Sequence, residues 1–83
     1  AEDIVARFGG DEFVLLLKGA DRQAATAVAE RVRDRVRARL GITVSIGLAV
    51  LPADAISASE LFVVADRRMF EAKRAGRDRL VGG

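Results

Sequence analysis

The stretch Arg7-Phe8-Gly9-Gly10-Asp11-Glu12-Phe13 determines how this chain is expected to fold. Apolar runs flank the two glycines, Ile4-Val5 before them and Phe13–Leu17 after them, which is the pattern of two strands joined by a tight hairpin turn. Glycine has no Cβ, so its backbone can adopt positive φ and a bulky anion can come close to its N–H groups. Two carboxylates follow at the mouth of the hairpin, and proteins hold hard cations such as Mg²⁺ with such oxygens and substrate phosphates. The pattern therefore predicts a hairpin that carries a site for phosphoryl or nucleotidyl transfer.

A helix is predicted after the hairpin, over residues 22–40. Asp21 is a good N-cap residue, apolar residues recur at i, i+3 and i+4 spacing, and Gly41 is typical of the residue that ends a helix. Residues 31–39 also suggest a strand, because arginines alternate there with other residues. Asp34 falls in the row that such a strand would bury, so the pattern favours the helix.

A strand over residues 42–50 follows, with large apolar side chains on one face and small side chains on the other. The small face can lie under a helix or beside a ligand. Ser57 and Glu60 have the spacing of a capping box, which predicts a second helix that ends before Gly76. Residues 79–81 are expected to form a short last strand.

The order of these elements predicts an α+β fold. The helices are too few, and the strands too closely joined by the hairpin, for a doubly wound parallel sheet. We therefore expect an antiparallel sheet with helices packed on one or both faces.

The composition excludes several classes of protein. The chain has 83 residues, 51% of them hydrophobic, so it can form one domain with an apolar core. It lacks cysteine and histidine, which removes disulfides, structural zinc and imidazole bases. Its 14 basic and 12 acidic residues are interspersed, and its only aromatic residues are 4 phenylalanines, which argues against a nucleic-acid partner. No apolar run approaches the ~18 residues of a membrane span, so no membrane contact by this segment is expected.

Three segments resemble one known family. R-F-G-G-D-E-F, at residues 7–13, is similar to the signature of GGDEF domains, the diguanylate cyclases that make cyclic di-GMP from two GTP molecules. Residues 43–47 resemble the family's buried strand, and Ala65-Asp66 together with residues 69–77 resembles its closing helix. The resemblance implies the palm-like sheet that these cyclases share with nucleotide polymerases. Because family members are longer, we expect residues 1–83 to be the C-terminal half of a single GGDEF domain.

The resemblance assigns the hairpin turn to the catalytic site. Asp11 matches a metal ligand beside the attacking hydroxyl, and Glu12 also lies in the family's site, so both are candidates for catalysis and for binding Mg²⁺ or Mn²⁺. Gly9 and Gly10 would let the substrate approach the backbone. An ordinary solvated turn is the alternative for these four residues. Adjacent strand residues point to opposite faces, so Asp11 and Glu12 are expected to have different roles.

Lys73 and Arg77 are the candidate phosphate ligands. From their i, i+4 spacing near a helix end alone, favourable interaction with the helix dipole is an equally good explanation. Family members hold the GTP phosphates with a lysine and an arginine at these positions. A lysine point charge and an arginine fork together suit a triphosphate.

An inhibitory cyclic di-GMP site is also implied by the resemblance. Many family members build it from an R-x-x-D motif before the signature and an arginine of the following helix. Asp3 matches the aspartate of that motif and Arg31 matches the helix arginine, while the leading arginine would precede Ala1. The other arginines between residues 31 and 39 are expected to form a solvated helix face.

The expected activity is condensation of two GTP into cyclic di-GMP with release of pyrophosphate, in bacterial second-messenger signalling. Two domains, each holding one GTP, would meet as a homodimer, and the 3′-hydroxyl of each GTP would attack the α-phosphate of the other. The family's second metal-binding aspartate and its guanine contacts lie upstream of the signature, outside this chain. The fragment alone is therefore expected to be inactive, in a cytoplasmic location, with any membrane anchor in another domain of its parent.

Two other functions fit fewer of these residues. The first is a regulatory GGDEF module that binds GTP or cyclic di-GMP without turnover, often coupled to a phosphodiesterase domain. An intact signature favours the enzyme, whereas missing upstream ligands would favour this module. The second is a purely structural dimerisation domain, which would need neither the glycine pair nor Lys73 and Arg77.

Overall fold

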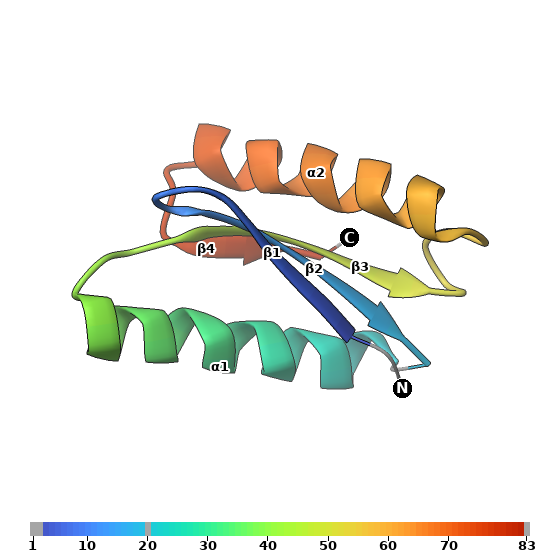
Figure 1. Ribbon diagram of the computed structural model, residues 1–83, viewed down its shortest axis with the longest axis horizontal. Coiled ribbons are helices and arrows are strands. Elements are labelled where there is room, and N and C mark those ends of the chain that lie inside the picture. Colours follow the sequence, from blue (N-terminus) through green and yellow to red (C-terminus); the bar gives the residue numbers. More distant parts are fainter. Residues whose placement is uncertain (1–2, 20, 83) are drawn as a thin grey trace.

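A four-stranded sheet with one helix on each face forms the protein (Figure 1). The computed structural model describes residues 3–19 and 21–82. In chain order the elements are β1 (Asp3–Gly9), β2 (Glu12–Lys18), α1 (Arg22–Leu40), β3 (Ser45–Leu51), α2 (Ala58–Arg74) and β4 (Arg79–Val81). The predicted helices, hairpin and short last strand are therefore present, and the α+β class is confirmed. Of the residues named above, Ala1 lies outside the described part of the chain.

The sheet is mixed, with strand order β1-β2-β3-β4. The hairpin strands β1 and β2 are antiparallel as expected, but β2 pairs with β3 in parallel and β3 pairs with β4 in parallel. The physical reason lies in the connections. A tight turn reverses the chain, whereas each of the helices α1 and α2 carries the chain back along the sheet, so that the next strand runs in the same direction.

Strand β2 is buried on both of its faces. Its residues Phe13–Leu17 are all buried, which fits their unbroken apolar run. Alternate side chains of β2 and β3 pack on opposite sides, toward α1 and toward α2. The side that α1 covers includes Phe13, Leu15, Leu17, Ile46, Leu48 and Val50. On the other side, Val14, Leu16 and Ala49 of the sheet pack with Leu61, Ala65 and Met69 of α2.

Local sequence signals fix the ends of both helices. The Asp21 carboxylate accepts a hydrogen bond of 2.7 Å from the backbone N–H of Ala24, and Gly41 closes α1 with φ 67°. Ser57 accepts a hydrogen bond of 3.3 Å from the backbone N–H of Glu60, as the capping box predicts. These caps satisfy backbone groups that a helix end leaves without partners.

Gly47 allows α2 to approach the sheet closely. A Cβ at this position would overlap the carbonyl oxygen of Ala65 and the backbone nitrogen of Met69. Because both of these are backbone atoms of α2, a larger side chain would force the helix away from β3. Gly47 and Ala49 of the predicted small face therefore lie under a helix. The strand itself begins at Ser45, three residues later than the predicted start at residue 42.

A buried carboxylate joins α1, α2 and the loop after β3. The side chain of Asp54 is 5% exposed and lies 2.7 Å from Nη2 of Arg22 and 2.9 Å from Nη1 of Arg68. The backbone N–H of Val50 also donates to it, at 2.8 Å. Burial alone would raise the pKa of Asp54, but the hydrogen bonds from Arg68 and Arg22 outweigh it and hold that pKa well below its usual range.

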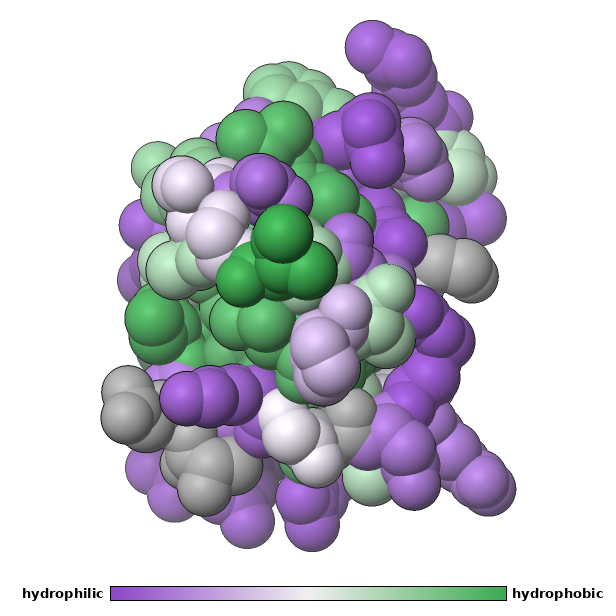
Figure 2. All heavy atoms as spheres, turned by 90° about the vertical axis from the view of Figure 1, so that its right-hand side faces the viewer, coloured by the Kyte–Doolittle hydropathy of each residue, from purple (hydrophilic) through white to green (hydrophobic). Residues whose placement is uncertain are grey.

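One end of the molecule is largely apolar. Figure 2 shows hydrophobic side chains gathered at the end that carries the start of α2, with polar side chains around them. A shallow cavity of about 180 Å³ lies here. It is lined by Ile4, Leu16, Leu17, Lys18, Leu51, Ala58 and Leu61. No helix in the described residues is both long and apolar enough to cross a membrane.

Replacing Asp54 by asparagine should destabilise the fold in a pH-dependent way. Removing the charge leaves Arg22 and Arg68 without their shared partner, and breaking a buried ion pair costs ~3 kcal/mol or more. The pKa of Asp54 is lower in the folded chain than the ~3.9 of an unfolded aspartate. The charge of Asp54 therefore contributes fully to the free energy of unfolding above about pH 4, and this contribution is lost as the pH falls from there through the pKa of the folded state. Urea denaturation at pH 7 and at decreasing pH should therefore show a gap between wild type and Asp54→Asn that narrows in acid.

The matched control is Asp34→Asn, which removes the charge of an exposed aspartate on α1. We expect this variant to unfold like the wild type at every pH. A constant gap between wild type and Asp54→Asn down to pH 2 would show that the ionised carboxylate is not the stabilising group.

Candidate functional site

Two ion pairs bring the four charged residues of the predicted site together. Asp11 accepts a hydrogen bond of 3.0 Å from Nη1 of Arg77, and Glu12 accepts one from Nζ of Lys73. The hairpin turn, the last turn of α2 and the start of β4 lie at the same end of the molecule (Figure 1). The sequence prediction that these four residues form one site is therefore compatible with the fold, although their roles stay predictions.

The two glycines of the turn have different surroundings, and approach of a substrate to their backbone stays a prediction. Positive φ angles occur at Gly19, Gly41 and Gly76 among the described glycines, so neither Gly9 nor Gly10 adopts one. Gly9 pairs with Glu12 across the hairpin, and a Cβ on Gly9 would overlap Oε1 of that glutamate. A Cβ on Gly10 would meet no atom within 4 Å. Gly9 therefore makes room for the Glu12 carboxylate, while Gly10 leaves open space beside the turn.

Arg7 holds the shape of the turn. Its guanidinium donates to the carbonyl oxygens of Gly9 at 3.2 Å and Gly10 at 2.8 Å. It also lies 5.7 Å from the ring centroid of Phe13, its partner across the hairpin. A bulge between Arg7 and Gly9 bends the strand just before the turn. No role is predicted for Arg7 from the sequence, where its one signal is its place at the start of the seven-residue motif.

The turn is also anchored to β3. The backbone N–H of Ser45 donates a hydrogen bond of 2.8 Å to the carbonyl oxygen of Asp11. The side chain of Ser45 is fully buried, and within the described residues its hydroxyl has no hydrogen-bond partner. Ser45 also pairs with Glu12 in the sheet, so an unpaired hydroxyl lies at the strand position beside the carboxylate.

The two ion pairs differ in exposure. The side chains of Lys73 and Glu12 are 23% and 21% exposed, whereas those of Arg77 and Asp11 are 55% and 41% exposed. Exposed pairs contribute ~0–1 kcal/mol to stability, so the outer pair does little for the fold. It remains accessible to a ligand that offers each partner a stronger counter-charge.

Arg77 lies beyond the end of α2. The helix ends at Arg74, so the i, i+4 relation that the sequence suggested for Lys73 and Arg77 is not a helical one. Arg77 belongs instead to a corner in which three successive residues have positive φ: Gly76 at 123°, Arg77 at 64° and Asp78 at 47°. Positive φ is uncommon for residues other than glycine, so this corner must be held by its surroundings.

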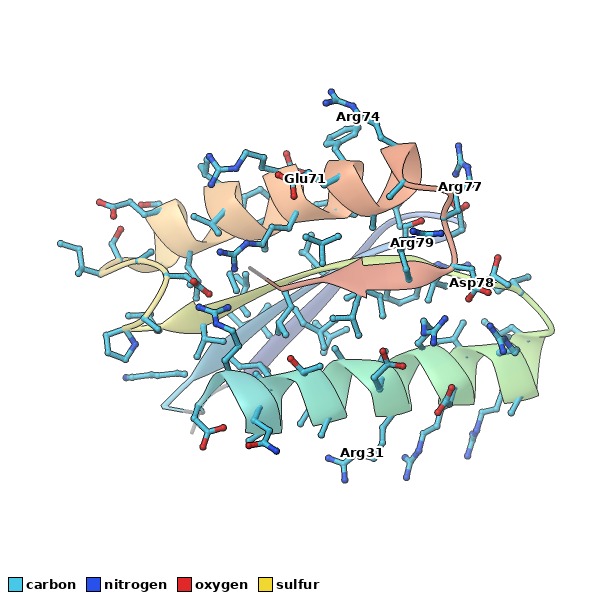
Figure 3. The ribbon with its side chains drawn as sticks, turned by 180° about the vertical axis from the view of Figure 1, so that it is seen from behind. Arg31, Glu71, Arg74, Arg77, Asp78 and Arg79 are labelled. Atoms are coloured by element: carbon cyan, nitrogen blue, oxygen red, sulfur yellow. The ribbon has the colours of Figure 1, made fainter. Side chains whose placement is uncertain are left out.

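Two arginines of α1 hold that corner through Asp78. Nη2 of Arg37 lies 2.7 Å and 2.9 Å from the two carboxylate oxygens of Asp78, and Nη1 of Arg33 lies 2.9 Å from one of them. Figure 3 shows Asp78 on the side of the corner that faces α1, and Arg77 beside the end of α2. Burial would raise the pKa of Asp78, but its bonds with Arg37 and Arg33 hold that pKa below the usual value. The expectation that these arginines form a solvated face is therefore wrong for Arg33, whereas Arg37 is exposed as expected and pairs with Asp78 as well.

Asp3 and Arg31, the residues predicted for an inhibitory site, are both exposed. Asp3 begins the edge strand β1, and Arg31 projects from α1 away from the sheet (Figure 3). No ion pair joins them within residues 3–19 and 21–82. Their assignment stays a prediction.

The donor set at the turn suits a divalent cation that is shared with a ligand. Within the described residues, no group of three or more Asp, Glu, His or Cys side chains gathers at one place. Asp11 and Glu12 supply two neighbouring carboxylates, and Mg²⁺ is commonly held by one or two carboxylates together with substrate phosphates. The residues present therefore fit Mg²⁺ or Mn²⁺ in a complex with a nucleotide.

Comparison with known proteins identifies the family. Residues 1–79 match the family described as "Diguanylate cyclase, GGDEF domain". The chain belongs to the GGDEF family. Within this family, synthesis of cyclic di-GMP from GTP with a divalent metal is the general activity. No solved structure matches the chain.

Three relatives show how the GGDEF chain is placed in longer proteins. It is 37% identical to a probable diguanylate cyclase, DgcT, of Escherichia coli, with 96% of the chain aligned to 20% of that protein. It is 39% identical to the bifunctional diguanylate cyclase/cyclic di-GMP phosphodiesterase MucR of Pseudomonas aeruginosa, with 94% of the chain aligned to 12% of it. It is 36% identical to diguanylate cyclase A of Treponema denticola, with 94% aligned to 23%. The chain therefore spans less than a quarter of each of these relatives.

Alanine at Gly9 and at Gly10 should have different effects. A methyl group at Gly9 displaces the flexible end of Glu12 and separates it from Lys73, whereas a methyl group at Gly10 enters open space. Both variants should keep nearly the wild-type melting temperature, because the displaced atoms belong to the tip of one side chain. NMR of the lysine ammonium groups should show a changed environment of Lys73 in Gly9→Ala only. Equal spectra of the two variants would contradict this role of Gly9.

Proposed function

We propose that this GGDEF chain supplies one half of the nucleotide site of a diguanylate cyclase domain, which condenses two GTP into cyclic di-GMP and releases pyrophosphate. The observation that carries the proposal is the pairing of two acidic with two basic side chains at the signature turn. The activity belongs to a longer protein, because the chain spans only 12–23% of the three relatives described above. The fragment by itself is proposed to be inactive.

Binding of a metal-bound nucleotide would exchange the partners of both ion pairs. Lys73 and Arg77 carry positive charge toward the turn, so the phosphates of GTP can replace the carboxylates as their partners. Asp11 and Glu12 are then free to act as ligands of a divalent cation. The bound Mg²⁺ or Mn²⁺ would neutralise phosphate charge and favour attack at the α-phosphate.

The four residues take different parts in this exchange. Asp11 lies in the exposed turn, where its carboxylate can face the attacking 3′-hydroxyl, as the family resemblance implies. Glu12 lies in β2 and belongs to the more buried pair, so the strand restricts where its carboxylate can reach once Lys73 has turned to the phosphates. Arg77 offers a planar fork to the outer phosphates, and Lys73 a point charge closer to the sheet. Catalysis in this scheme consists of positioning and charge neutralisation.

Each proposed site holds a single GTP, so the reaction needs two domains. The 3′-hydroxyl of one GTP attacks the α-phosphate of the other, and the reciprocal attack closes the ring. A homodimer of GGDEF domains in the cytoplasm, where GTP is available, is therefore part of the proposal. The regulatory module that binds GTP or cyclic di-GMP without turnover is the outcome to distinguish from it.

Replacing Asp11 by asparagine tests the catalytic assignment. In the longer protein that carries this chain, Asp11→Asn keeps the size of the side chain but removes the charge that binds a divalent cation. Formation of cyclic di-GMP from GTP and Mg²⁺ should fall by on the order of 100-fold or more, with little change in melting temperature. Asp34→Asn, which alters an exposed aspartate of α1, should retain full activity.

Undiminished product formation by Asp11→Asn would refute the role of this carboxylate. A wild-type protein that binds GTP tightly but makes no product with either metal would instead identify the regulatory module.

Replacing Arg31 by alanine tests the proposed inhibitory site. If Asp3 and Arg31 bind cyclic di-GMP, Arg31→Ala should weaken inhibition by added cyclic di-GMP. Calorimetry should show an affinity for cyclic di-GMP that is lower by about ten-fold or more, because the bidentate contact of Arg31 with a phosphate is lost. Arg39→Ala is the matched control, because it removes the same charge from α1, and Arg39 does not line the hollow beside Arg31. Equal inhibition of the wild type and both variants would leave Arg31 as a solvated side chain.

A further inference from the structure

The corner at residues 76–78 connects the candidate site to a helix on the far face of the sheet. Its first residue follows α2, and its last residue leads into β4. The backbone N–H of Arg77 donates to the carbonyl oxygen of Ala72 at 3.0 Å, and that of Arg79 donates to Val44 at 3.2 Å. The corner is therefore tied at both ends, and the conformation between these ties determines where Arg77 points.

That conformation is unfavourable for the residues that adopt it. Arg77 and Asp78 both have positive φ, at 64° and 47°. This region is sterically unfavourable for an L-residue, although aspartate tolerates it better than most. Two such residues in succession persist only where the surroundings favour them over alternatives. The contacts that favour this corner come from α1.

The contacts with α1 are specific in their geometry. Arg37 donates to both carboxylate oxygens of Asp78, at 2.7 Å and 2.9 Å. Arg33 donates to the carboxylate and to the backbone carbonyl of Asp78, each at 2.9 Å. The Arg33 side chain is 21% exposed, and its Nε is buried without a partner among the described residues. Burying an N–H donor without a partner costs free energy, so an arginine whose only role was solubility would be expected to stay in the solvent.

We infer that Arg33 and Arg37 are positioning residues of the nucleotide site, which act through Asp78 on Arg77. By binding the carboxylate and the backbone of Asp78, they hold the corner in the conformation that directs the Arg77 guanidinium to the signature turn. Neither arginine touches the turn itself. This inference rests on the proposed function, since it takes Arg77 to be a ligand of the GTP phosphates.

Nucleotide binding by variants of α1 that each lose one arginine tests the inference. The probe is α,β-methylene-GTP, whose bridge cannot be cleaved at the α-phosphate, titrated by calorimetry in the presence of Mg²⁺ into the longer protein. Arg77→Ala should weaken binding about ten- to hundred-fold. Arg37→Ala should weaken it by about five-fold, as expected for residues coupled through a shared partner. Arg39→Ala removes the same charge from the last turn of α1, has no ion pair in the described chain, and should bind like the wild type.

A double-mutant cycle separates positioning from general destabilisation. If Arg37 acts through Arg77, then Arg37→Ala in an Arg77→Ala background should change the affinity by less than about two-fold. Because Arg37 reaches both carboxylate oxygens through one nitrogen, Nη2, Arg37→Lys keeps a donor for Asp78 and should restore part of the loss. Arg33→Ala should behave like Arg37→Ala in both backgrounds.

The outcomes distinguish this inference from the proposed function. If Arg77→Ala weakens binding while Arg37→Ala and Arg33→Ala match Arg39→Ala, the positioning role is refuted and the phosphate role of Arg77 stands. If Arg37→Ala weakens binding equally with and without Arg77, its effect is general and the inference is also refuted. Unchanged binding by Arg77→Ala would refute both the positioning role of the two α1 arginines and the phosphate role of Arg77.

Discussion

Burial of β2 on both faces is the constraint on which the rest of the structure depends. Its five consecutive apolar residues, Phe13–Leu17, need a cover on each side, and α1 and α2 provide one each. Once β2 is fixed between the helices, the turn that precedes it must emerge at one end of the sheet. The return path of α2 over Gly47 then brings the last turn of that helix to the same end. The candidate site is thus a consequence of how the core is packed, although none of its charged residues belongs to the core.

The same arrangement explains why two kinds of ion pair occur in this chain. Asp54 is buried and shared by two arginines, and it joins elements that must stay together for the fold to persist. The pairs at the signature turn are more exposed, and each can be opened without uncovering the core. Asp78 lies between these cases, because it is partly exposed but determines the direction of a neighbouring side chain. Burial, rather than charge, therefore separates the structural pair from the pairs of the candidate site.

Much of the fold could be predicted from the sequence because its signals are local. The caps at Asp21 and Ser57, the helix end at Gly41 and the small face of residues 42–50 each depend on neighbouring positions. The parallel pairing of β2 with β3, and the contacts of Asp54 and Asp78, depend on residues far apart in the chain, and an isolated aspartate in a loop resembles a solvated one. The need for glycine at position 9 was also not predicted. It arises from the side chain of Glu12 across the hairpin, and not from the backbone conformation of the glycine itself.

The paired charges at the turn also bear on how a nucleotide would first meet this site. Each carboxylate lies against a cation, so the fields of these four charges largely cancel, and together they contribute little potential at long range. Long-range attraction of an approaching anion would then have to come from other charges at this end, such as Arg7, which bonds only backbone carbonyls of the turn. Discrimination among nucleotides would then arise after contact, when the ligand competes for partners that are already satisfied.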